Sequence, residues 1–419
     1  MTLHDEILAI GNNAVTAARR LALLNGRRRR NILLAMADAV DSQRNRIKQA
    51  NESDLFSGKQ AGLSAAMLDR LALTDARIDA MLKGLREVAG LKDCIGKTIR
   101  KWTRPNGLII RKVRVPIGVI AIIYESRPNV TADAAGLCLK TANAVILRGG
   151  KEAINSNQAI VRAMSEGGAS QGLPRDAIQL VATTDREAVR ELVRLEGIVD
   201  LVMPRGGEQL IRAVVENAKV PVIKHYKGVC HIYVDESANL EMALNIIENA
   251  KCQRPGVCNA VEKVLVHEAL AFSFIPLLAD KLNAKGVELR GDEASRVFAG
   301  EKIKPAVEED WSAEYLDLIL AVKIVPSTQA AVEHINHYGS HHSDAIITES
   351  AGSKKMFLDQ VDSAAVYANA STRFTDGGEF GLGAEVGIST DKLHARGPMG
   401  LEELTSYKYE VLGTGQVRA

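Results

Sequence analysis

Strands and helices alternate along most of this chain after residue 117, and that rhythm limits its fold more than any other feature. Residues 118–124 are apolar on both faces of an extended segment, which is typical of a strand buried inside a parallel sheet. Further apolar runs alternate with segments of helical periodicity, and these runs span 144–147, 178–181, 198–203 and 220–223. Repeated βα units of this length predict a doubly wound parallel sheet.

A second βα series follows the first. Its predicted strands are 231–235, 318–322 and 344–348, and its predicted helices are 240–249, 272–282 and 330–336. Residues 1–96 instead carry apolar side chains at helical spacing throughout. We therefore expect an α/β protein with two sheet domains, the first of them preceded by helices.

Two further segments, 108–115 and 406–412, are rich in β-forming residues and alternate between apolar and polar positions. This pattern predicts strands with one wet face, which pair with each other into a small projecting sheet. Because isolated ribbons are marginal in water and exposed edges favour pairing, we expect the chain to form a homo-oligomer.

The charge balance excludes several classes of partner. The 419 residues include 53 basic and 51 acidic side chains, so no basic field favours a nucleic acid or an anionic membrane. No apolar run approaches the roughly 20 residues that span a bilayer, and the N-terminal segment lacks the features of an export signal. Five cysteines without paired spacing fit a reducing compartment. These features predict a cytoplasmic protein.

One cysteine, Cys258, lies in a polar turn that spans 253–260 and is broken by Pro255 and Gly256. Such a turn holds a thiol at the wall of a cleft, with backbone N–H groups facing a bound oxygen. Arg254 would favour the thiolate, which is the reactive form. Burial as a small apolar side chain is the ordinary role of a cysteine, but the flanking residues argue against it here.

Neighbouring histidines and cysteines allow two other interpretations. A structural zinc site uses tight pairs of ligands such as C-x-x-C, and the sequence contains none, so we expect no metal. A cysteine acyl hydrolase would use either His225 or His231 as its base, although it would leave the first half of the chain unexplained.

Two predicted strands of the first series end in glycine pairs. Gly149 and Gly150 follow one strand, and Gly206 and Gly207 follow another. Glycine lets the backbone approach a ligand closely, and a following helix N-terminus favours phosphate. Neither pair belongs to a G-x-G-x-x-G motif, so turn glycines without a ligand fit equally well. If a dinucleotide binds, its 2′-phosphate would suit the cations of these loops, Arg148, Lys151 and Arg205.

Four stretches of the chain, 124–129, 253–260, 314–317 and 334–344, resemble motifs of the aldehyde dehydrogenase superfamily. The resemblance runs nearly from end to end, and it is nearest to a branch that reduces an acyl phosphate in proline synthesis. It implies a cofactor-binding domain (1–100 and 117–228), a catalytic domain (229–370), a small β oligomerisation extension (101–116 and 401–419) and a segment that returns to the cofactor domain (371–400).

The resemblance also implies roles for individual residues. Cys258 matches the nucleophile, the strand end at 148–152 holds the adenosine ribose, and the turn at 204–207 faces the pyrophosphate. Glu314 matches the acid that holds the nicotinamide ribose, and the implied cofactor is NADPH. Asn129 would help to stabilise the oxyanion, and Arg127 and Arg254 would bind the phosphate or the carboxylate of the substrate.

One departure from the superfamily narrows the reaction. Oxidising members carry a glutamate that activates water, whereas the matching segment 224–228 contains no carboxylate. A reductase must avoid hydrolysing its thioester, so this loss is chemically sensible. The implied substrate is L-glutamyl 5-phosphate, supplied by a separate glutamate kinase. Another acyl-phosphate reductase and a hydrolytic aldehyde dehydrogenase remain the alternatives.

Overall fold

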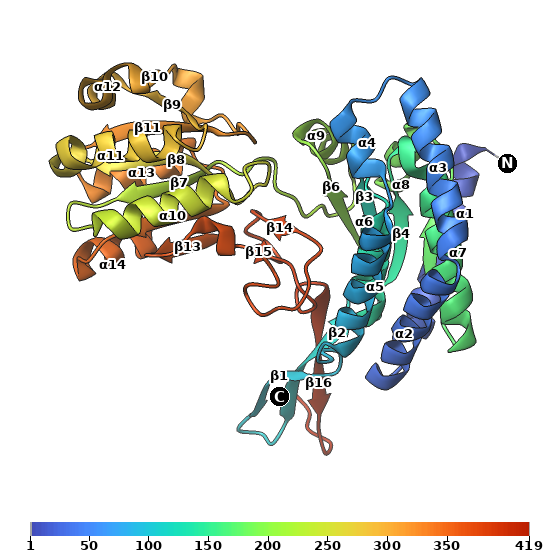
Figure 1. The fold of residues 1–419 in the computed structure, drawn as a ribbon. Helices are drawn as coiled ribbons and strands as arrows, with labels where there is room; N and C mark the ends of the chain where they lie inside the picture. The colour runs from blue at the N-terminus through green and yellow to red at the C-terminus, as the bar shows by residue number, and fades with distance from the viewer. Residues whose placement is uncertain (1, 419) are drawn as a thin grey trace. The chain divides into compact units, whose positions relative to one another are not determined.

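The computed structural model describes residues 2–418 of the chain. They form two compact units (Figure 1): the first contains residues 2–224, 381–387 and 399–418, and the second contains 225–380 and 388–398. The segment 371–400 is therefore divided between the two units. Within residues 2–418, none of the helices combines the length and apolar character needed to cross a membrane.

The first unit is built on a parallel sheet with strand order β5-β4-β3-β6. Its strands are β3 (Val119–Tyr124), β4 (Ala144–Arg148), β5 (Ile178–Leu180) and β6 (Leu201–Arg205). The helices are α1 (Leu3–Leu21), α2 (Gly26–Ser42), α3 (Arg44–Gln60), α4 (Ala65–Leu71), α5 (Asp75–Gly90), α6 (Asn129–Lys140), α7 (Ile154–Ser170), α8 (Glu187–Leu192) and α9 (Glu208–Asn217).

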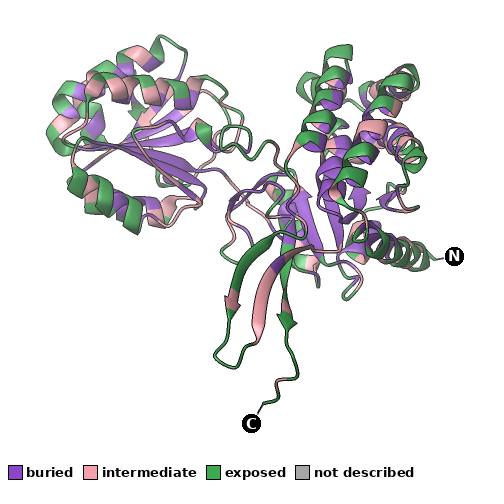
Figure 2. Ribbon diagram, turned by 90° about the horizontal axis from the view of Figure 1, so that it is seen from below, coloured by how far each residue is buried: buried purple, intermediate pink, exposed green. Residues whose placement is uncertain are grey.

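Right-handed crossovers explain how these helices are distributed. Helix α6 connects β3 to β4, and α7 connects β4 to β5, so both crossovers move in the same direction across the sheet. The two helices contact each other. Helix α8 connects β5 to β6 on the other side of β3, and it packs against α1. The sheet is therefore covered on both faces, which confirms the doubly wound architecture and explains why β3 and β4 are fully buried (Figure 2).

Two predictions for this sheet need correction. The predicted strand at 220–223 is only an isolated bridge between Val202 and Val222, because Pro221 has no N–H to extend the pairing. The strand predicted at 198–203 begins only at Leu201, because the N–H groups of Ile198 and Val199 bond back to Leu195 and close the preceding turn.

A separate antiparallel sheet, β1-β2-β16, projects from the first unit. It consists of β1 (Thr98–Thr103), β2 (Ile109–Pro116) and β16 (Thr405–Leu412). Strand β16 pairs with β2 from Thr405 opposite Pro116 to Leu412 opposite Ile109. The pairing predicted for the two alternating segments is confirmed.

The second unit contains a parallel sheet with the order β10-β9-β11-β8-β7-β12-β13. Its strands are β7 (Cys230–Val234), β8 (Val261–His267), β9 (Glu288–Gly291), β10 (Lys304–Pro305), β11 (Ile319–Val325), β12 (Ser343–Ile347) and β13 (Ala365–Ala368). The helices are α10 (Leu240–Cys252), α11 (Ala271–Asn283), α12 (Glu293–Ala299), α13 (Thr328–Tyr338) and α14 (Ala351–Gln360), and a short pair, β14 (Ile388–Ser389) and β15 (Gly397–Pro398), lies near the end of the chain.

Two apolar clusters hold this sheet between its helices. One cluster joins α10 and α11 to one face through residues such as Ile247 and Phe274. The other joins α13 and α14 to the opposite face through Ile335 and Phe357. The sequence predicted the strands β7, β11 and β12 and the helices α10, α11 and α13. It did not predict β8 or α14, and it missed the short elements β9, β10, α12 and β13, whose few residues carry little periodicity.

Candidate active site

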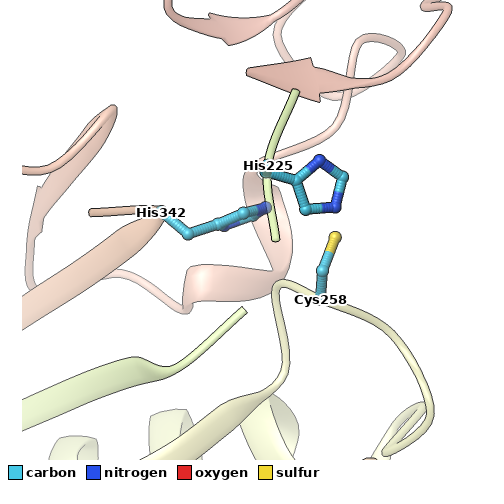
Figure 3. Close-up of side chains that lie close together, drawn as sticks. All are labelled: His225, Cys258 and His342. Carbon is cyan, nitrogen blue, oxygen red and sulfur yellow. The ribbon is translucent and has the colours of Figure 1, made fainter. Parts of the chain in front are cut away.

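Three side chains converge where neighbouring strands of the second sheet begin. His225 precedes β7, Cys258 precedes β8 and His342 directly precedes β12. The strands β8, β7 and β12 are adjacent and parallel, so their starts meet at one edge of the sheet. The ligand atoms of the three side chains lie within 4.8 Å of one another (Figure 3). Sequence spacing concealed this cluster because its members are far apart along the chain.

The two histidines differ in environment. His225 is half-buried, and its Nδ1 lies 2.7 Å from the carbonyl oxygen of Ile388. Since Nδ1–H donates to that carbonyl, Nε2 carries the lone pair. His342 is fully buried, and burial lowers its pKa to about 3, so its ring stays neutral at physiological pH. His231, the other base considered from the sequence, is instead bonded to Asp344 at 3.1 Å.

Arg373 braces the turn that carries Cys258, a role that the sequence did not reveal. Its Nε donates to Gln253 Oε1 at 2.9 Å, and its Nη1 donates to the side-chain oxygen of Asn259. Asn259 also donates to the carbonyl of Thr375 at 2.9 Å. The pKa of Arg373 is lowered by its burial and then by the nearby charge of Arg254, which itself is exposed.

The backbone of Cys258 lies directly against the segment that leads into β7. A Cβ added at Gly228 would lie 1.9 Å from the carbonyl oxygen of Cys258, so only glycine fits there. The thiol of Cys230 donates to the same carbonyl at 3.2 Å. Glu314 accepts the N–H of Gly228 at 2.7 Å. The carboxylate that the resemblance assigns to the nicotinamide ribose therefore contacts the segment that leads into β7.

A pocket of about 630 Å³ lies in the first unit, a volume typical of ligand sites. It opens beyond the carboxyl ends of β3, β4 and β6, where ligands of doubly wound sheets bind. A Cβ at Gly150 would lie 2.5 Å from Ser126 Oγ, so the glycine leaves room at the pocket wall. The cysteine site, in contrast, lies at the amino ends of its strands.

The three cations predicted for this pocket differ in whether they line it and in whether they are exposed. Lys151 is exposed at the pocket wall. Arg148 also lines the pocket, but its guanidinium donates to the carbonyls of Gly149, Thr184 and Asp185, and burial lowers its pKa. Arg205 does not contribute to the lining, and its guanidinium lies against Gly387. Arg186, which the sequence analysis overlooked because its loop carries no motif, faces the pocket.

The remaining predicted residues also lie in the first unit. Arg127 lines the pocket, and Asn129 is exposed at the start of α6, where its amide donates to Asp133 at 3.2 Å. Gly207, at the start of α9, donates its N–H to Glu125 at 2.6 Å, and Gly206 is packed against the same side chain. A carboxylate thus occupies the position that the resemblance assigns to pyrophosphate.

The aldehyde dehydrogenase family model matches residues 4–300 of the chain. The chain belongs to the aldehyde dehydrogenase family, and it is an oxidoreductase of a family that uses nicotinamide cofactors.

Its relatives within that family are gamma-glutamyl phosphate reductases. The enzyme of Moorella thermoacetica is 56% identical over 418 residues, which cover 100% of both chains. The enzyme of Caldanaerobacter subterraneus subsp. tengcongensis is 55% identical, and the match covers 99% of this chain and 100% of the relative. The crystal structure of the Thermotoga maritima enzyme, 48% identical, superimposes with a TM-score of 0.97 and covers 99% of this chain and 100% of that one. The aldehyde dehydrogenase-like fold expected from the sequence is confirmed.

Proposed function

We propose that the chain catalyses the NADPH-dependent reduction of L-glutamyl 5-phosphate to L-glutamate 5-semialdehyde, with release of phosphate, in proline synthesis. The observation that carries this proposal is the position of Cys258. Its turn is fixed by Arg373 and Gly228, and its thiol belongs to the cluster with His225. Near-complete similarity to gamma-glutamyl phosphate reductases supports the choice of substrate.

The chemistry begins at Sγ of Cys258. His225, whose Nε2 has the lone pair, accepts the thiol proton, and the thiolate attacks the acyl carbon and displaces phosphate. NADPH, when bound, supplies the hydride that turns the resulting thioester into a thiohemiacetal. Collapse of the thiohemiacetal returns the thiolate and releases the semialdehyde. The backbone N–H of Cys258 and the amide of Asn129 are the proposed donors to the oxyanion.

The cluster around Cys258 contains histidines and no carboxylate among the described residues. The glutamate that activates water in oxidising aldehyde dehydrogenases therefore has no counterpart in the cluster. We assign NADPH to the pocket of the first unit, with Lys151 and Arg186 near its 2′-phosphate, and Arg127 and Arg254 to anionic groups of the substrate.

Two wider proposals follow from this function. The acyl phosphate must come from a kinase that phosphorylates the side-chain carboxylate of glutamate. In the described part of the chain none of the five cysteines forms a disulfide, which suits a cytoplasmic location.

The reverse reaction tests the proposal. L-glutamate 5-semialdehyde and NADP⁺ should yield NADPH only when inorganic phosphate is present, because phosphate must accept the acyl group from Cys258. Steady NADPH formation in buffer without phosphate and arsenate would instead identify a hydrolytic aldehyde dehydrogenase. A reaction with other aldehydes at equal kcat/KM would identify a different acyl-phosphate reductase.

A further inference from the structure

The cluster at the start of β7, β8 and β12 also has the composition of a metal site. It offers one sulfur and two imidazole nitrogens, from Cys258, His225 and His342, within 4.8 Å of one another. Thiolate and imidazole together select soft or borderline cations such as Zn²⁺ over Mg²⁺ or Ca²⁺. The sequence contains no tight pairs of ligands, and its spacing therefore argued against a metal. The fold nevertheless brings three ligands together from the starts of three neighbouring strands.

An independent observation at His342 points to a ligand. Its side chain is completely buried, and within the described structure its Nε2 has no hydrogen-bond partner. Its Nδ1 lies 2.9 Å from Ser343 Oγ, and in the tautomer whose Nδ1–H donates to that hydroxyl, Nε2 carries the lone pair. A buried nitrogen without a partner is costly, and a cation bound at Nε2 would satisfy it.

The second imidazole is held in the matching tautomer. The bond from Nδ1–H of His225 to the Ile388 carbonyl, at 2.7 Å, fixes the ring and leaves Nε2 as the ligand nitrogen. Metal-bound histidines usually donate their other N–H to such an oxygen. The two imidazole rings lie edge to face, with centroids 5.6 Å apart, and they converge on Cys258 (Figure 3).

We propose that His225, Cys258 and His342 bind one Zn²⁺, which caps the nucleophile and holds the enzyme in a reversible inactive state. Tetrahedral zinc places such ligand atoms roughly 3.4–3.7 Å apart, so the cluster must close by about 1 Å, chiefly through the half-buried Cys258 and His225. The thiol gives its proton to solvent as the Zn–S bond forms, and water completes the fourth position. The loss of activity rests on the proposed role of Cys258, whereas the binding does not.

Cobalt(II) is the probe for the site, since its spectrum reports the ligands directly. The chelator-treated full-length protein should bind one Co²⁺ and develop a near-ultraviolet thiolate-to-cobalt band with the visible bands of four-coordination. Cys258→Ser should remove the thiolate band, and His342→Asn or His225→Asn should weaken Co²⁺ affinity by more than roughly tenfold. Cys230→Ala is the matched control, because this thiol neighbours the cluster but donates to a backbone carbonyl. The thiolate-to-cobalt band should persist in this variant.

A zinc titration of reductase activity separates this site from the proposed function. Zn²⁺ should inhibit the protein, a chelator should restore activity, and His342→Asn should raise the inhibitory concentration by more than roughly tenfold. Active protein without a stoichiometric thiolate band would overturn the site and leave the function standing. Metal-free protein that lacks reductase activity, but that develops the band when Co²⁺ is added, would overturn the function and leave the site. A band that survives Cys258→Ser would also overturn the site.

Discussion

At the residue scale, we expect the proposed nucleophile, Cys258, to be sensitive to a neighbouring position that carries no chemistry of its own. Gly228→Ala would place a methyl group against the carbonyl of Cys258 and push the thiol away from its working position. A misplacement of about 1 Å can lower turnover about a hundredfold, and we expect a loss of that order in steady-state assays. Gly352→Ala, where the nearest atom to the new Cβ is 3.7 Å away, should leave turnover unchanged.

The proposed nucleophile itself gives the most direct prediction. Cys258→Ser should abolish reduction while circular dichroism and the melting temperature stay near those of the parent, because a hydroxyl forms almost no anion at neutral pH. Cys252→Ala removes a half-buried thiol at the end of α10, and this variant should retain most of the activity. Substantial turnover by Cys258→Ser would remove the cysteine from the mechanism.

We expect cofactor preference to depend on two cations of the pocket in the first unit, Lys151 and Arg186. Lys151→Gln with Arg186→Gln should lower kcat/KM for NADPH and leave that for NADH nearly unchanged, since a 2′-phosphate needs nearby positive charge and a plain ribose does not. Arg205→Gln is the control, because Arg205 lies outside the pocket lining. Equal kcat/KM for NADPH and NADH in the parent protein would contradict the assignment.

At the element scale, α13 carries a buried histidine that makes the second unit sensitive to acid. Burial first, and then the charges of His231, Lys323, His337 and Lys263, lower the pKa of His334 to about 3. The folded pKa lies below the unfolded value, so the unfolded state binds more protons below about pH 6.5. Stability is therefore lost as the pH falls from that value toward 3.

His334→Phe should reduce this loss. The ring would remain between Trp311 and Tyr338, but it could not be protonated in the unfolded state. Urea unfolding at pH 7 and at pH 4 should show a smaller decrease in unfolding free energy for the variant than for the parent. The exposed neighbour His337, changed to Gln, should leave the parent's decrease intact. Equal decreases for His334→Phe and the parent would show that His334 is not responsible.

The elements that the sequence predicted well are those with strong periodicity. Strand β3 is apolar at every position, and α7 and α11 have long apolar faces, so both type and place could be read from the pattern. The active-site turn could be located because Pro255 and Gly256 interrupt a helix beside a cysteine. The partners of Cys258 could not, because Arg373 and His342 approach it only through the order of strands in the folded sheet.

At the scale of the whole molecule, the projecting sheet predicts association. Tyr407, Tyr409 and Val411 occupy one face of β16, and each is about half exposed or more. Light scattering at micromolar concentration should give a mass above that of a single chain. Tyr409→Glu should shift the mass toward the monomer, while Lys408→Gln, on the opposite face, should not. A parent protein of monomer mass would rule out the oligomer.

The pairing of β16 with β2 also determines when the first unit can be completed on the ribosome. Thr405 lies opposite Pro116, and the whole second unit is synthesised between the two strands. At roughly 5–20 residues per second, β2 waits on the order of 15 to 60 s for its partner. During that interval one edge of β2 is open to other nascent chains. Translation speed and chaperone access over this window should therefore govern the yield of native protein, even though neither alters the finished fold.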